Sequence, residues 1–180
     1  MSFDLEFAQS CISQIVDYPV PGVIFKDVTP IAANAVAFNS VLGAIESHFS
    51  KSGVTHIVGI EARGFIFGAA LAARMGLGFI PIRKSGKLPR QTHRVEYALE
   101  YGNDAIEIHT DALKPNDVVL VIDDVLATGG TACAALDLIS QCGAKAESLV
   151  VLLNLEFLGG QATVNRAYPE VEIFTLFPDA

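Results

Sequence analysis

The chain has 180 residues, 51% of them hydrophobic, and a formal net charge of -8 at pH 7. This length and apolar content suit one well-packed domain, so we expect a single domain over residues 1–180. The negative charge argues against binding to nucleic acid or to an anionic membrane, since both need a basic surface. No apolar run reaches the roughly 20 residues of a membrane helix, and the N-terminus lacks the basic start of a signal peptide, so we expect a cytoplasmic protein.

The N-terminal segments show helical periodicity interrupted by turn residues. Apolar residues recur at helical spacing over residues 5–16, and the Pro- and Gly-containing stretch 18–22 should end that helix. A loop is expected over residues 23–30. The pattern of residues 31–49 then predicts a second helix.

The rest of the chain alternates between short strands and helices. Four apolar runs look buried on both faces, which is typical of parallel central strands. Helical patterns follow the first run and the third, and a last strand is expected near the C-terminus. The predicted strands are residues 54–60, 79–82, 118–122, 148–153 and 171–177, and the helices between them are residues 64–75 and 130–142.

One segment departs from this alternation. Residues 95–101 and 105–109 lie on either side of Gly102-Asn103 and resemble an antiparallel hairpin, as a flap over a parallel sheet would. The chain is therefore predicted to have an α/β fold. In such an open sheet ligands bind beyond the carboxyl ends of the strands, where successive loops converge.

The strongest functional pattern is residues 118–131, VVLVIDDVLATGGT, which read as a strand ending in two acids, a turn of small residues and a helix start. Gly129 and Gly130 let the backbone approach an anion, and unpaired N–H groups at the helix start supply donors. The run lacks the GxxxxGK[ST] lysine and the GxGxxG spacing, so we expect a different phosphate ligand. At a strand end both Asp123 and Asp124 could face the cleft, where they suit sugar hydroxyls or a hydrated metal ion.

This run resembles the phosphoribosyl diphosphate motif of type I phosphoribosyltransferases. The resemblance implies the family's fold: a central, mostly parallel sheet flanked by helices, with a small N-terminal hood and a flexible antiparallel flap. It also implies that Asp123 and Asp124 contact the ribose hydroxyls and that the loop after them wraps the 5-phosphate. The implied phosphate-binding residues are Ala127, Thr128, Gly129, Gly130 and Thr131. Enzymes of this family displace diphosphate from ribose carbon 1 with a nitrogen base, usually with Mg²⁺ on the diphosphate.

Residues 59–68, GIEARGFIFG, place an arginine after a predicted strand. A guanidinium fork there can bind diphosphate oxygens in a bidentate way. The segment resembles the signature of the adenine phosphoribosyltransferases. That resemblance implies that Arg63 binds diphosphate at the catalytic centre and that the Glu61–Ala62 peptide bond is cis.

Residues 83–94 hold five of the twelve lysines and arginines of an acidic chain. The Gly- and Pro-containing part, residues 83–90, is called the basic loop below; it reads as a lid that closes on a multiply charged ligand. It resembles the RKxGKLP loop of the same enzymes, which implies that Lys84 and Lys87 bind diphosphate. After Pro89 the sequence departs from that pattern, so Arg90, His93 and Arg94 are given no role.

Two further segments concern the base. Residues 97–102, YALEYG, resemble the LEYG element of the adenine phosphoribosyltransferases, which implies that Glu100 is the acid–base residue handling the adenine proton. Residues 21–30 contain an aromatic in a turn-rich stretch and resemble PGVxFRD of the same enzymes. The implied adenine-binding residues are Phe25, by stacking, and Lys26, which replaces the family's arginine and acts through its backbone.

The histidines and cysteines have no metal-binding spacing, so no metal site made by protein side chains is predicted. The leading interpretation is an enzyme of purine salvage that converts adenine and phosphoribosyl diphosphate to AMP and diphosphate with Mg²⁺, and the resemblance implies a homodimer. Three alternatives remain: a transferase for an oxopurine, a regulatory sensor of phosphoribosyl diphosphate with this fold, and a receiver domain. The sensor fits less well, because only about fifty residues precede the first predicted sheet strand and the net charge is -8. The receiver domain fits less well because its acidic pair follows the first strand, whereas Asp123 and Asp124 come late in the chain.

Overall fold

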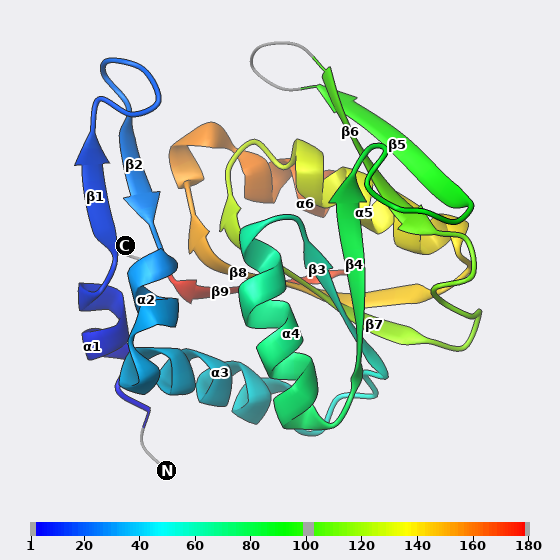
Figure 1. The fold of residues 1–180 in the computed structure, drawn as a ribbon, viewed down its shortest axis with the longest axis horizontal. Coiled ribbons are helices and arrows are strands. Elements are labelled where there is room, and N and C mark those ends of the chain that lie inside the picture. The colour runs from blue at the N-terminus through cyan, green and yellow to red at the C-terminus, as the bar shows by residue number, and fades with distance from the viewer. Residues whose placement is uncertain (1–2, 99–102, 179–180) are drawn as a thin grey trace.

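A computed structural model of the chain describes residues 3–98 and 103–178. Its elements alternate between helices and strands along most of the chain (Figure 1). The helices are α1 (Leu5–Ser10), α2 (Thr29–Ala33), α3 (Ala35–Phe49), α4 (Arg63–Met75), α5 (Gly130–Gln141) and α6 (Gly160–Ala167), with a short 3-10 helix at Glu156–Leu158. The strands are β1 (Ser13–Val16), β2 (Ile24–Asp27), β3 (His56–Ile60), β4 (Gly78–Lys84), β5 (Thr92–Ala98), β6 (Asn103–His109), β7 (Val118–Leu126), β8 (Lys145–Asn154) and β9 (Glu172–Phe177).

Seven of these strands form one sheet in the order β5-β6-β4-β3-β7-β8-β9. The five strands from β4 to β9 in that order run parallel, whereas β6 pairs antiparallel with β4 and β5 pairs antiparallel with β6. The antiparallel pair β5–β6 is the predicted flap, and it forms one edge of the sheet (Figure 1). The predicted α/β fold with a mostly parallel central sheet is therefore confirmed.

The central strands are buried on both faces, as their continuous apolar runs indicated. On β3, Ile57 packs with α3 and α4 on one face of the sheet, while its neighbour Val58 packs with α5 on the other. Both side chains are fully buried. Because successive side chains point to opposite faces, a strand covered by helices on both sides needs apolar residues at every position.

Helix α4 packs close to the sheet, and two glycines make this possible. A Cβ atom on Gly64 would lie 2.6 Å from the carbonyl oxygen of Ile122, and one on Gly68 would lie 2.8 Å from the Ile122 side chain. Any larger residue would push α4 away from β7. The close contact brings the first residue of α4, Arg63, beside the end of β7.

Two expectations for the N-terminal region were wrong. The helix predicted over residues 5–16 ends at Ser10, and β1 and β2 pair antiparallel in place of the predicted helix end and the loop 23–30. Ile15 and Val16 are exposed on this hairpin. In so short a segment the apolar residues fit a helical spacing and a strand equally well, and pairing with β2 satisfies the backbone of β1. The β1–β2 hairpin, called the hood below, stands beside the parallel sheet (Figure 1) and is the small N-terminal hood that the resemblance implied.

The other differences concern element ends. The helix predicted over residues 31–49 is divided at Asn34, whose extended backbone ends α2 and whose side chain caps α3 by accepting hydrogen bonds from Val36 N–H (3.0 Å) and Ala37 N–H (3.2 Å). Strand β7 continues to Leu126, beyond the predicted end at residue 122. Among the residues that the structure describes, no helix is long and apolar enough to cross a membrane.

Candidate active site

Three of the predicted site residues, Arg63, Asp123 and Asp124, lie at the carboxyl ends of β3 and β7. These strands are neighbours, but the chain reaches β4 on the far side of β3 before it returns to β7. The connections that leave β3 and β7 therefore diverge, and such a switch point in an open parallel sheet is where ligands bind. Arg63 begins the helix after β3, and the acidic pair lies near the end of β7.

Two adjoining cavities open at this point. The hood cavity has a volume of about 510 Å³ and the phosphate-loop cavity about 410 Å³. They share Asp123, Val125, Ala127 and Thr131 as wall residues. The other residues of the hood cavity include Phe25, Lys26, Glu61, Ala62, Arg63, Lys84, Tyr97, Asp124 and Leu155.

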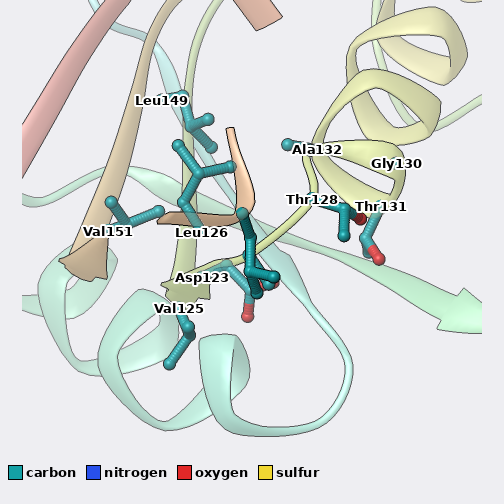
Figure 2. A pocket seen from close by; sticks show the side chains of 12 residues that line it. Asp123, Val125, Leu126, Thr128, Gly130, Thr131, Ala132, Leu149 and Val151 are labelled. Carbon is teal, nitrogen blue, oxygen red and sulfur yellow. The ribbon is translucent and has the colours of Figure 1, made fainter. Parts of the chain in front are cut away.

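The phosphate-loop cavity is lined by all five residues of the predicted phosphate loop, residues 127–131. Figure 2 shows Thr128 and Thr131 at the start of α5, across from Asp123. Gly129 caps that helix with φ 89°, a left-handed conformation that favours glycine. The first-turn N–H groups of α5 have no partner within the helix, so this end of the cavity suits an anion.

The two acids have different surroundings. The carboxylate of Asp124 is buried and accepts a hydrogen bond from Arg63 Nε. Asp123 lines both cavities, and its Oδ1 accepts the N–H of Asp124 at 2.9 Å. Burial, together with the negative charge of Asp124, raises the pKa of Asp123 well above its ordinary value. Burial lowers the pKa of Arg63, but the hydrogen bond to Asp124 and the nearby carboxylates raise it overall, so the guanidinium stays charged.

Phe25, on strand β2 of the hood, lines the hood cavity. The guanidinium carbon of Arg63 lies 5.5 Å from the centre of its ring, and the Tyr18 ring meets it edge-on at 5.3 Å. Lys26 lines the same cavity. The half-buried Phe25 ring thus joins the hood to the arginine that contacts Asp124.

Glu61 connects the end of β3 to the basic loop. The Glu61–Ala62 bond is cis, as the resemblance implied. The Glu61 carboxylate accepts Arg83 Nε and Nη2, each at 3.1 Å, and the Lys84 N–H at 3.0 Å. The hydrogen bond from Arg83 lowers the pKa of Glu61, although burial opposes this. Arg83 therefore faces Glu61 and takes no place in the cavity wall.

The predicted lysines of the basic loop lie in different places. Lys84 lines the hood cavity, and its Nζ lies 3.0 Å from Asp104 Oδ2 on β6. That hydrogen bond raises the pKa of Lys84 and lowers that of Asp104. Lys87 is exposed and lines neither cavity. Glu100 lies outside the described residues.

Sequence reasoning missed two wall residues of the hood cavity. Tyr97 on β5 projects into the cavity, and its partial burial raises the pKa of its hydroxyl. Leu155 follows the end of β8 and also lines this cavity. The alternation along β5 could have placed Tyr97 on the side of Lys84, but only once the pairing of β4, β6 and β5 was known.

Residues 30–177 match the family model of the Phosphoribosyl transferase domain. The chain therefore belongs to the phosphoribosyltransferase family. The adenine phosphoribosyltransferase of Streptomyces clavuligerus is 52% identical over 167 residues, which are 93% of this chain and 94% of that protein. The enzyme of the same name from Aeromonas salmonicida (strain A449) is 48% identical over 163 residues, 91% of this chain and 90% of that protein.

The fold agrees with this family. The crystal structure of adenine phosphoribosyltransferase from Saccharomyces cerevisiae, complexed with adenine and an imino-altritol bisphosphate, superposes with a TM-score of 0.87. The match covers 95% of this chain and 98% of the yeast chain at 36% identity. The resemblance to adenine phosphoribosyltransferases inferred from the sequence motifs is thereby confirmed.

Proposed function

We propose that this chain transfers the 5-phosphoribosyl group from phosphoribosyl diphosphate to adenine and releases AMP and diphosphate, a reaction of purine salvage. One observation carries the proposal: two adjoining cavities line up an aromatic ring, a guanidinium, an acidic pair and a phosphate loop. A base, a ribose and a phosphate occur in that order in AMP. The relatives named adenine phosphoribosyltransferase, and the yeast structure with adenine, support adenine as the base.

In this proposal the sugar phosphate binds at the end of β7. Asp123 and Asp124 accept hydrogen bonds from the two ribose hydroxyls. The N–H groups of residues 127–131 and the hydroxyls of Thr128 and Thr131 donate to the 5-phosphate. Asp123 is poised for this role because it lines both cavities.

Cationic side chains bind the diphosphate leaving group. Arg63 and Lys84 line the hood cavity, and Arg63 is the catalytic cation nearest to the acidic pair. Lys87 is on the basic loop outside the cavity, so we propose that it reaches diphosphate when that loop closes. Both cations now pair with carboxylates, Arg63 with Asp124 and Lys84 with Asp104. Diphosphate therefore competes with these carboxylates for the two cations.

The donor set fits a Mg²⁺ ion carried mainly by the substrate. Residues 3–98 and 103–178 contain no group of three or more His, Cys, Asp or Glu side chains that could hold a metal ion. The carboxylates of Asp123 and Asp124 do supply hard oxygen donors beside the cavity, and Mg²⁺ commonly takes one or two carboxylates together with phosphate oxygens and water. A Mg²⁺ ion held there by Asp123 or Asp124 would supply positive charge to neutralise the departing diphosphate.

The adenine ring binds on the hood side. Phe25 stacks on the base, and the backbone at Lys26 reads its amino edge. Glu100 acts as the acid–base residue that relocates the proton lost when adenine N9 attacks ribose carbon 1. We further propose that the enzyme is a cytoplasmic homodimer.

A steady-state assay with each purine tests the proposed function. The purified protein is incubated with phosphoribosyl diphosphate, Mg²⁺ and either adenine, hypoxanthine, guanine or xanthine, and the nucleotide and diphosphate formed are measured. AMP formed from adenine in equal amounts with diphosphate supports the proposal. Turnover of an oxopurine but not of adenine would overturn it in favour of the oxopurine alternative.

A further inference from the structure

Glu107 on β6 is a buried acid outside the two cavities. Glu107 and Asp124 are the acidic residues that the described part of the chain buries, and Asp124 belongs to the site described above. Glu107 is only 6% exposed. A buried carboxylate is costly unless its oxygens accept hydrogen bonds, so its partners show what it holds in place.

Both carboxylate oxygens of Glu107 bind the start of the basic loop. The Ser85 hydroxyl donates to Oε1 at 2.6 Å, and the Gly86 N–H donates to Oε2 at 3.1 Å. Ser85 Oγ in turn accepts a hydrogen bond from Arg94 Nε at 3.2 Å, which places Arg94 at the same cluster. These contacts fix the turn at which the basic loop leaves β4, where Gly86 has φ 77°.

The strand register explains how this cluster acts on the cavity. Strand β6 lies between β4 and β5. On β6, Glu107 lies opposite Arg83 of β4 and Arg94 of β5, while Ile106 lies opposite Lys84 of β4. Neighbouring residues of a strand point to opposite faces. Glu107 therefore holds the loop from the face that Lys84 does not use, and Lys84 is left facing the hood cavity.

We propose that Glu107 is a positioning residue that, through Ser85 and Arg94, fixes the stem of the basic loop and so aims Lys84 at the diphosphate subsite. This inference rests on the proposed function and adds a residue to it. It also gives Arg94 a structural task, although the sequence motif assigned it none. In the more distal part of the loop, Arg83 Nη1 donates a hydrogen bond to Lys87 O at 3.2 Å, and this part can still close over the ligand.

The kinetic test compares Glu107→Gln with wild type. The amide keeps the shape of the side chain but removes the charge and one acceptor, so KM for phosphoribosyl diphosphate should rise about tenfold. KM for adenine should stay near its wild-type value, and kcat should fall less than KM rises. The matched control is Glu147→Gln, because Glu147 pairs with Lys145 on the exposed start of β8 and should leave all three constants unchanged.

Ser85→Ala removes the donor of the hydrogen bond between the Ser85 hydroxyl and Glu107. It should produce the same split between the two KM values. The double variant Ser85→Ala/Glu107→Gln should be little worse than Glu107→Gln alone, because both substitutions break one interaction. Fully additive effects in this cycle would overturn the shared role.

A readout independent of catalysis is limited trypsin digestion at Lys87 of the free protein. Trypsin should cut the Glu107→Gln variant at Lys87 faster than it cuts wild type or Glu147→Gln. All three proteins should have the same melting temperature at the assay pH. Equal cleavage rates together with an unchanged KM for phosphoribosyl diphosphate would overturn the positioning role. A wild-type protein that makes no AMP would instead refute the proposed function, so the two failures are distinguishable.

Discussion

Gly160, the first residue of α6, packs directly against the backbone of the phosphate loop, residues 127–131. A Cβ atom on this residue would lie 2.2 Å from the carbonyl oxygen of Ala127 and 2.9 Å from the Gly129 nitrogen. Both contacts are with backbone, which cannot rotate away as a side chain can. Gly160→Ala must therefore move the phosphate loop or α6 by roughly 1 Å to restore ordinary contact distances.

The size of the effect follows from that displacement. A misplacement of about 1 Å at a substrate-binding element can cost about 100-fold in rate, so kcat/KM for phosphoribosyl diphosphate should fall by about this factor. Overpacking should also cost about 1–3 kcal/mol, which corresponds to a fall of roughly 2–12 °C in melting temperature for a chain of this size.

Steady-state kinetics and thermal unfolding of the variant measure both effects. Gly53→Ala is the matched control, because a Cβ atom on Gly53 would meet nothing within 4 Å and should change neither quantity. Wild-type kinetics in a folded Gly160→Ala protein would refute the reasoning that this contact sets the position of the phosphate loop.

Three further predictions follow from the assigned roles. Phe25→Ala should raise KM for adenine by roughly tenfold to 100-fold through loss of stacking, with Phe157→Ala as an exposed aromatic control; an unchanged KM would contradict the stacking role. Glu100→Leu should lower kcat by about 10²–10⁴-fold in single-turnover assays while phosphoribosyl diphosphate still binds, and normal turnover would remove its acid–base role. Asp123 has a raised pKa when folded, so the stability it contributes is full below its ordinary value near 3.8 and is lost as the pH rises through the raised value. Melting curves of Asp123→Asn should therefore lose this part of the pH dependence and show a more stable protein at neutral pH, whereas profiles parallel to wild type would contradict the assignment.

The central sheet could be predicted because burial on both faces leaves a continuous apolar run. Strands β3, β4, β7 and β8 were all predicted within a few residues of their observed ends. The family resemblance implied a small N-terminal hood, but the residue pattern did not predict its two strands, because Ile15 and Val16 are exposed and pair with β2. A two-stranded hairpin outside the core leaves no burial pattern in the sequence, and its apolar residues suggested a helix.

The site divides in the same way. Local motifs were enough to predict the residues that the structure places in the two cavity walls, since each motif carries its own backbone geometry. These residues are the acidic pair, the phosphate loop, Arg63, Lys84 and Phe25. Contacts between distant segments were not readable. Tyr97 and Leu155 reach the hood cavity only through strand pairing. Glu107 belongs to no motif, and only the fold shows that Ser85 and Gly86 donate hydrogen bonds to its carboxylate.

The central claim is that the two adjoining cavities hold one nucleotide, with its base on the hood and its phosphate at the start of α5. A crystal structure of the protein with AMP tests this most directly. We predict the adenine ring against Phe25, the ribose hydroxyls on Asp123 and Asp124, and the 5-phosphate on the N–H groups of residues 127–131. AMP bound elsewhere, or with its phosphate away from that loop, would contradict the account.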